Sequence, residues 1–337
     1  MGAIFWPANS KVYVFCPGGY ATGGPEALHQ LAHHLNNLGF DACMYYYSTP
    51  AGQNGLHENY VKYQVPVADK PENSSRSIMI VPESFLYPIF NKKFNKIRKV
   101  IWWLSVDYYF IELNKHIERL KKKKFYKLRN ALGAFKVASF ERLRGMEIAH
   151  IGHSYYSVVQ LRENGIEPIG QIADYMNDAF FDEEGLPQKE DVIIYKPKKN
   201  DEFLASIISQ TPGLVWKPLV DMSPAEVAGW MARAKLYIDF GYHPGKERMP
   251  REACVMRCCM IIGKSGSAAY AEDMPIPEKY RFGKNDKQVP EIIACIKDCL
   301  TNYDKRIEDF KPYRDVVYSE KEKFVEDIKK VFVKILK

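Results

Sequence analysis

The stretch from Lys11 to Tyr47 reads KVYVFCPGGYATGGPEALHQLAHHLNNLGFDACMYYY, and it decides the fold. Its β-rich start, Lys11–Cys16, is followed by a turn that holds four glycines. Apolar side chains then recur at helical spacing, and Gly39 is a typical helix stop. The chain resumes as a strand over Asp41–Tyr47. This order is a βαβ unit, whose crossover predicts a parallel sheet.

The same alternation of strands and helices continues through the chain. Further strands are expected at Ser77–Val81, Lys99–Val106, Glu147–Ile151, Asp191–Tyr195, Leu214–Pro218, Leu236–Phe240 and Met260–Gly263. Ser223-Pro224-Ala225-Glu226 is a capping box that predicts a helix start, and Glu320–Leu336 reads as a charged amphipathic helix. The pattern predicts an α/β protein of two parallel domains, with the boundary between residues 165 and 190.

Charge is distributed unevenly along the chain. The formal net charge is +7, yet residues 92–144 hold 16 basic and 4 acidic side chains, which gives +12 for this segment alone. A uniformly basic, histone-like protein is therefore excluded, whereas a local contact with an anionic partner is not. The composition, with 46% hydrophobic and 26% charged residues, is that of a globular protein rather than a disordered one.

The cysteines and the apolar runs bear on the compartment. The seven cysteines include no C-x-x-C pair, and the adjacent Cys258 and Cys259 are poorly placed for a disulfide, so we expect reduced thiols. No apolar run approaches the roughly 18–20 residues of a membrane helix, and the start of the chain lacks the layout of a secretory signal. We expect a cytoplasmic protein that contacts a membrane surface, if at all, through Lys92–Arg144.

The glycine turn is the first candidate binding site. Gly18, Gly19, Gly23 and Gly24 precede a helix, where glycines allow close backbone approach and exposed N–H groups favour anions. The spacing matches neither the dinucleotide fingerprint nor a P-loop. A tight structural connection is the alternative, but ligands of open α/β sheets bind at the carboxyl ends of strands, which favours a site.

A second candidate site directly follows the strand Leu236–Phe240. The segment His243–Ala253 brings basic and acidic groups to a helix that starts near Pro250, an arrangement that suits a phosphorylated ligand. A solvated loop before a capped helix is the alternative. We select as donor-site candidates His243, Gly245, Lys246, Arg251 and Glu252.

Three further strand ends add weaker candidates. Tyr195, Lys196 and Lys199 end the first strand of the second domain, where lysines could clamp a diphosphate. Pro218 ends the neighbouring strand, and Ser265 lies in an anion-friendly turn after Met260–Gly263. We expect no metal and no other cofactor, because His33 and His34 lack a third ligand and no Asp-x-Asp occurs.

Several motifs together resemble those of GT-B glycosyltransferases. They are WWLSVD (102–107), HSYY (153–156), DYMND (174–178), the His243–Ala253 segment with its PREA (250–253), and CCMIIG (258–263). The closest resemblance is to the glycosyltransferase family 4 and family 1-like group. It implies two Rossmann-like domains with parallel sheets facing a central cleft. On this basis residues 1–168 would bind the acceptor, 169–316 the nucleotide sugar, and 317–337 would form a helix crossing back.

The resemblance also implies roles for individual residues. Glu252 would hold the nucleotide ribose, and a lysine among Lys196, Lys198, Lys199 and Lys246 would neutralise the diphosphate, without a metal. The family has another glutamate eight residues before the one that holds the ribose. Pro244 occupies that place here, and Glu247 lies five residues before Glu252. The stereochemistry of transfer therefore stays open.

The catalytic candidates depend on that stereochemistry. We assign them as Glu247, His153 and Asp107. In an inverting reaction His153, Asp107 or Glu26 could deprotonate the acceptor, and in a retaining reaction the leaving phosphate could do so itself.

The partners expected are a nucleotide sugar and a glycan, a lipid-linked molecule or another acceptor. A nucleotide-sugar epimerase or a phosphorylase would use the same two-domain plan. A nucleic-acid-binding protein, or a glycosyltransferase acting on nucleic acid, would use the basic segment Lys92–Arg144. We rank nucleic acid lower, because the anion-friendly turns at strand ends call for a small anionic ligand.

Overall fold

The structure is a computed structural model that describes residues 4–6, 10–49, 54–125, 127, 137–176, 185–197 and 202–334. Contacts divide the chain into two compact units. Unit 1 comprises Met1–Asp174 and Lys323–Lys337, and unit 2 comprises Tyr175–Glu322. The boundaries predicted after residues 168 and 316 thus each lie six residues before those of the structure, at 174 and 322.

Unit 1 alternates strands and helices over most of its length. Its elements before the boundary are β1 (Ile4–Trp6), β2 (Lys11–Pro17), α1 (Gly23–Asn37), β3 (Asp41–Tyr47), η1 (Glu58–Tyr63), β4 (Ile78–Pro82), α2 (Tyr87–Phe90), η2 (Lys92–Phe94), β5 (Arg98–Trp103), α3 (Val106–Lys121), α5 (Phe140–Arg144), β6 (Ile148–Gly152), α6 (Tyr155–Glu163) and β7 (Gly170–Gln171).

The main sheet of unit 1 is parallel and runs in the order β3-β2-β4-β5-β6-β7. The predicted βαβ unit is confirmed: Val12 of β2 pairs with Ala42 of β3 on one side and with Ile78 of β4 on the other. Because β3 lies on one side of β2 and every later strand lies on the other, the strand order reverses between β2 and β4. Such a switch point is where open α/β sheets bind ligands.

Local sequence effects shift two predicted boundaries in unit 1. The predicted strand Lys99–Val106 ends at Trp103, because the Ser105 hydroxyl accepts a hydrogen bond from the Tyr108 N–H and so caps α3 from Val106 onward. Helix α1 begins at Gly23, so Pro25 is its third residue rather than its first.

Unit 2 repeats the alternation with shorter strands. Its elements are β8 (Glu190–Tyr195), α7 (Glu202–Ser209), β9 (Val215–Pro218), α8 (Pro224–Arg233), β10 (Ala234–Asp239), α9 (Arg248–Val255), β11 (Cys259–Gly263), η5 (Gly266–Ala269), η6 (Glu278–Tyr280), β12 (Arg281–Phe282), η7 (Asp286–Gln288), α10 (Val289–Thr301), α11 (Tyr303–Arg306), η8 (Ile307–Phe310) and α12 (Lys311–Tyr318).

The sheet of unit 2 is also parallel, in the order β12-β11-β10-β8-β9. All four strands predicted for this half are present. The capping box is confirmed, since the Ser223 hydroxyl accepts from the Glu226 N–H and the Glu226 carboxylate accepts from the Ser223 N–H. The edge strand β12 has only two residues, and a strand this short shows no periodicity in the sequence.

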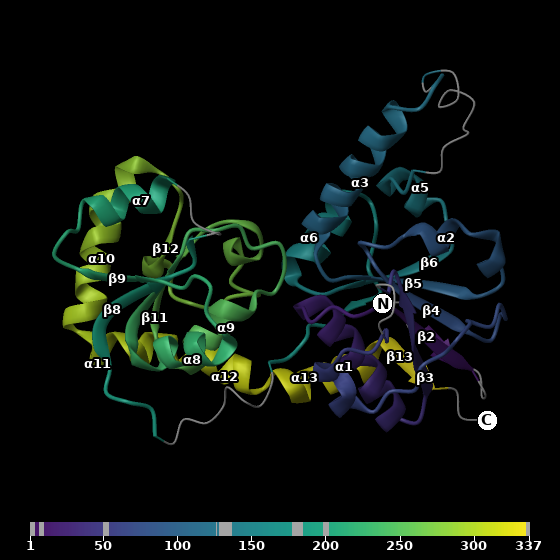
Figure 1. Cartoon of the computed structure of the whole chain (residues 1–337), viewed down its shortest axis with the longest axis horizontal. Coiled ribbons are helices and arrows are strands. Elements are labelled where there is room, and N and C mark those ends of the chain that lie inside the picture. Colours follow the sequence, from purple (N-terminus) through teal and green to yellow (C-terminus); the bar gives the residue numbers. More distant parts are fainter. Residues whose placement is uncertain are drawn as a thin grey trace. The chain divides into compact units, whose positions relative to one another are not determined.

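The last long helix returns the chain to unit 1. Helix α13 (Glu320–Val331) ends before the predicted Leu336, because Phe332–Lys334 form strand β13 and pair in parallel with β1. Phe324 packs edge-on against the ring of His34 on α1, with ring centroids 5.5 Å apart. Figure 1 shows the yellow helix α13 beside α1. The C-terminal segment therefore belongs to the core of the N-terminal unit.

Two further findings concern the cysteines and the helices. All seven cysteines lie among the described residues and are free thiols, in agreement with the reduced state that we expected. Of the helices in the described residues, none combines the length and the apolar character that crossing a bilayer requires.

Candidate functional site

The carboxyl edge of the unit 2 sheet gathers the second set of candidates. Strand order reverses at β8, which lies between β10 and β9. Tyr195 at the end of β8 pairs with Ile238 of β10 and with Pro218 of β9, so the three strands end at one level. The turn after β8, which carries Lys196, therefore leaves the sheet beside the loop that follows β10. Lys199 lies outside the described residues.

The loop after β10 is held by the turn after β11. The N–H of Ser267 donates to the carbonyl of His243 at 2.8 Å, and its hydroxyl donates to the carbonyl of Gly245 at 2.6 Å. Gly266 adopts a φ of +57°, and a Cβ there would lie 2.0 Å from the His243 carbonyl oxygen. The structure thus brings His243, Gly245 and the turn of Ser265 together.

A buried polar cluster supports this loop from below. The Asp239 carboxylate accepts hydrogen bonds from the Tyr237 hydroxyl and from the Gly241 N–H, both at 2.7 Å. His243 Nε2 lies 3.8 Å from the same carboxylate, and both side chains are fully buried. Burial, with the nearby carboxylates of Asp239, Glu247 and Glu252 adding to it, holds the pKa of Tyr237 well above its usual value. The hydroxyl therefore stays protonated and keeps donating to Asp239.

The sequence analysis missed Tyr237 and Asp239. Both lie within a strand that reads as a buried apolar run, so its pattern indicates core packing and nothing more. The signal available in the sequence was that Tyr237 and Asp239 are polar residues on a strand that ends at the switch point.

The structure engages the cations of both Arg251 and Lys246 within the protein. Arg251 is completely buried, and its guanidinium lies 2.9 Å from the Glu320 carboxylate and donates to the carbonyls of Lys246 and Glu247. The Lys246 ammonium lies 2.7 Å from the other oxygen of Glu320. The contact of Arg251 with Glu320 ties α9 to the start of α13. A loop rich in charges looked like a ligand site because no local pattern pairs it with Glu320, 69 residues away.

The two glutamates of this segment lie on α9. Glu247 is the N-cap residue of α9, and Glu252 lies in the middle of this eight-residue helix. Both are half-buried, and both are close enough to Tyr237 to act on its pKa. Glu252 is thus placed near the loop of His243, as a ribose-binding residue would need to be.

The glycine turn forms the corresponding edge of unit 1. The N–H of Gly18 donates to Tyr47 and that of Gly19 to Gly55, both at 2.9 Å, and Gly19 has a φ of +78°. A Cβ on Gly18 would lie 2.4 Å from the Thr49 hydroxyl. These two glycines are therefore required by a tight turn. Gly23 and Gly24 start α1, and a Cβ on Gly24 would touch Leu104 at 3.6 Å.

Glu83 lies at the switch point of unit 1 and was not predicted. It follows β4, is 4% exposed, and accepts a hydrogen bond of 2.7 Å from the N–H of Leu104. Burial raises the pKa of Glu83 to about 8, against the opposing effect of the backbone N–H groups of Leu104 and Ser105. The carboxyl is therefore largely protonated at neutral pH. Its place directly after the strand Ser77–Val81 was the signal that could have found it.

The two catalytic candidates of unit 1 lie at different helix starts. His153 ends the β6 segment, is 5% exposed, and its Nε2 lies 3.2 Å from the Asp174 carboxylate and 3.1 Å from the Asp174 backbone nitrogen. Asp107, in the first turn of α3, accepts a hydrogen bond of 2.9 Å from the Tyr156 hydroxyl. Both side chains thus have partners within unit 1 that fix their orientation.

The remaining titratable side chains bear on whether a metal ion could bind. Among the residues that the structure describes, no group of three or more His, Cys, Asp or Glu side chains is arranged to hold an ion. Glu26, a further base candidate, is buried and accepts a hydrogen bond of 3.0 Å from the Tyr63 hydroxyl.

Comparison with known proteins gives matches in structure but not in sequence. No family model matches the chain, and no curated protein matches its sequence. Among solved structures, a glycosyltransferase from Rickettsia africae has a TM-score of 0.61 at 12% identity, covering 96% of this chain and 99% of that one. Anabaena HepE in complex with UDP-glucose has a TM-score of 0.60 at 12% identity, with 94% and 98% covered.

Two further solved structures are similar to this chain. Sucrose-phosphate synthase from Thermosynechococcus elongatus has a TM-score of 0.62 at 12% identity, with 95% of this chain and 97% of that chain covered. The chain spans only 56% of the length of a further similar structure, TarM. Together with the two parallel α/β units, these matches show that the chain has the GT-B fold of glycosyltransferases.

Proposed function

We propose that the protein is a glycosyltransferase that takes a sugar from a nucleotide-sugar donor bound at the carboxyl edge of the unit 2 sheet. The observation that carries this proposal is the reversal of strand order at β8, which places Lys196 beside the loop of His243 and Gly245. The structure of HepE with UDP-glucose supports the same donor class, because that protein shares the fold of this chain.

The residues at this edge suit the parts of a nucleotide sugar. Lys196 and the N–H groups at the start of α9 would stabilise the departing diphosphate without a metal. Tyr242, which is 49% exposed, offers an aromatic ring beside the loop, and Glu252 would accept hydrogen bonds from the ribose hydroxyls. The Lys246 ammonium pairs with Glu320 and would have to leave that carboxylate to reach a diphosphate.

The acceptor would bind to unit 1, where Asp107 and His153 remain the base candidates. If the reaction inverts the anomeric configuration, one of these groups takes the acceptor proton, and the contact between His153 and Asp174 would orient the imidazole. If it retains the configuration, the leaving phosphate takes the proton and Glu247 is the carboxylate candidate. Product NMR of the anomeric proton distinguishes the two cases.

The other readings gain no support from the structure. The fold matches are to glycosyltransferases, which does not favour an epimerase or a phosphorylase. A nucleic-acid role rests on Lys92–Arg144, of which residues 126 and 128–136 lie outside the described part of the chain. A membrane contact through the same segment also stays a proposal.

Isothermal calorimetry with a panel of UDP-, GDP- and ADP-sugars tests the proposed function. We expect saturable binding to one nucleotide class, with the matching free nucleotide competing for the site. Absence of binding by every member of the panel, confirmed by an unchanged thermal midpoint of unfolding, would contradict the proposal.

A further inference from the structure

Unit 1 contains a cavity of about 710 Å³ that the proposed donor site does not use. One wall comes from Glu83–Leu86, α2 and η2, and the other from α3 together with Ala138. The volume is typical of a small-molecule site, for which roughly 300–1,000 Å³ is usual. The cavity starts at the carboxyl end of β4, so it is continuous with the switch point of the unit 1 sheet.

The floor of the cavity is apolar and held in place. Leu86, Tyr109 and Leu120 line it and are each less than 10% exposed. The Tyr109 hydroxyl donates to the Ala138 carbonyl at 2.8 Å, and its ring packs on Phe140 with centroids 4.7 Å apart. These contacts fix α3 against the segment Ala138–Phe140, so the cavity needs little rearrangement to accept an apolar group.

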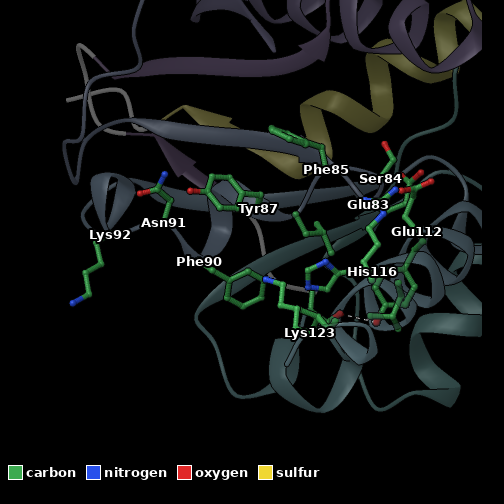
Figure 2. Close-up of a pocket in the computed structure, with 16 residues that line it drawn as sticks. Glu83, Ser84, Phe85, Tyr87, Phe90, Asn91, Lys92, Glu112, His116 and Lys123 are labelled. Carbon is green, nitrogen blue, oxygen red and sulfur yellow. Dashed lines mark hydrogen bonds between the residues drawn. The ribbon is translucent and has the colours of Figure 1, made fainter. Parts of the chain in front are cut away.

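The side of α3 that faces the cavity also carries a row of basic groups. His116 and Arg119 lie one helical turn apart on this side, and Lys123, two residues beyond the end of α3, also lines the cavity. All three are exposed. Figure 2 shows Phe90 on the opposite wall from His116 and Lys123, whereas the end of Lys92 points away from them.

The carboxyl groups of the cavity offset little of this charge. Glu112 lies 2.8 Å from the ammonium of Lys115, a residue outside the lining. Glu83 is largely neutral at pH 7, because burial raises its pKa to about 8. The cavity therefore combines an apolar floor with net positive charge at one side.

We propose that this cavity binds an amphiphile with a phosphate head group. Its hydrocarbon part would lie on the floor of Leu86, Tyr109 and Leu120, and its phosphate would lie between Arg119 and Lys123. A phosphate near its second ionisation matches the charge of two cations, and an Arg guanidinium can bind it through two parallel hydrogen bonds. If the proposed function holds, on which this step rests, the amphiphile is the sugar acceptor.

Charge and shape together favour this occupant over others. Free phosphate would leave the apolar floor uncovered, and a nucleic acid strand would use a longer groove than a cavity of about 710 Å³ offers. A neutral glycan would leave the row of cations unused. An amphiphile of opposite charge uses both parts of the lining.

Calorimetry with monomeric dodecyl phosphate, without any nucleotide sugar present, tests the inference. We expect saturable binding that falls at least about tenfold in the variant Arg119→Ala/Lys123→Ala, because two charge-assisted contacts are lost. The control Lys121→Ala/Lys122→Ala removes the same charge from the end of α3 outside the lining and should bind as the parent does. Leu113→Trp should fill the cavity and abolish binding, with circular dichroism confirming its fold.

Four outcomes would overturn the inference. They are equal binding by the Arg119→Ala/Lys123→Ala variant, equal binding of uncharged dodecyl maltoside, equal binding of inorganic phosphate, and binding only to vesicles that contain phosphatidic acid. The last result would point to a membrane surface contact instead of a cavity. Because nucleotide-sugar binding is measured separately, a protein that binds UDP-sugars but not dodecyl phosphate would refute this inference and leave the proposed function standing.

Discussion

The protonation of Glu83 should be visible in the stability of the protein. Its pKa is raised from an ordinary 4.5 to about 8 in the folded chain, so the native state binds the extra proton between these values. The free energy of unfolding should therefore fall as pH rises through this window, by at most about 1.4 kcal/mol per pH unit. Below pH 4.5 the contribution is fully present.

The variant Glu83→Gln should remove this pH dependence, because the amide stays neutral and can still accept from the Leu104 N–H. Denaturant unfolding at pH 5, 7 and 8.5 should show the variant gaining on the parent as pH rises. Glu58→Gln, at an exposed site, is the control and should track the parent. Parallel curves for parent and Glu83→Gln would show that the carboxyl is already ionised at pH 5.

Glu252 should matter for the donor and little for the fold. Replacing Glu252 by Ala removes a carboxylate that we place on the ribose, so the affinity for the nucleotide should fall about 10- to 100-fold, the value of a charged hydrogen bond. Calorimetry on Glu252→Ala and on Glu291→Ala, an exposed site on α10, measures the difference. Unchanged affinity in Glu252→Ala would remove the ribose assignment.

Sequence patterns identified the residues at strand ends but not their partners. Lys196, His243 and Gly245 could be selected because each follows a strand at the predicted carboxyl edge. The burial of Arg251 against Glu320 could not be predicted, since pairing across 69 residues leaves no local periodicity. Charged residues in a loop therefore look alike in sequence whether they face a ligand or the core.

Among the helices, α9 and α13 depend on one buried ion pair. Glu320→Ala would leave the fully buried Arg251 without this carboxylate, and breaking a buried pair in this way costs about 3–5 kcal/mol. Denaturant unfolding should show that loss. Asp315→Ala, which breaks an exposed pair with Lys311 on α12, should cost less than about 1 kcal/mol. Similar losses in both variants would mean that the buried pair contributes no more than a surface one.

The turn between β11 and η5 should tolerate no side chain at Gly266. A Cβ there would overlap the His243 carbonyl, and the φ of +57° is strained for other residues, so Gly266→Ala should destabilise by more than about 2 kcal/mol. Gly229→Ala, in helix α8 with open space around it, should instead stabilise by about 0.5–1 kcal/mol. Thermal unfolding of both variants checks the contrast, and a neutral Gly266→Ala would mean that the His243 loop can move away.

Strand and helix types were largely predictable, whereas the order of strands was not. The run Lys11–Cys16 and the capping box at Ser223 carry strong local signals. The reversal of order between β2 and β4, and again at β8, arises from crossovers that sequence periodicity does not encode. Ser105 shows a different limit, because its cap ended a strand that propensity alone would have continued to Val106.

For the chain as a whole, the GT-B fold explains why the two ends of the sequence meet in unit 1. Residues from Lys323 onward pack with the N-terminal sheet, and β13 pairs with β1. The net charge of +12 on residues 92–144 falls in the same unit, and some of these basic residues line the cavity beside α3. The charge surplus thus belongs to the proposed acceptor side, and the donor candidates with the strongest geometry belong to unit 2.

Hydrogen exchange measured by mass spectrometry, with and without a saturating nucleotide sugar, tests the central claim most directly. We expect slower exchange in three segments of unit 2, namely residues 195–197, 241–247 and 264–267, with α10 unchanged as an internal reference. Protection confined to unit 1, or no protection at saturation, would contradict the claim that the donor binds at the carboxyl edge of the unit 2 sheet.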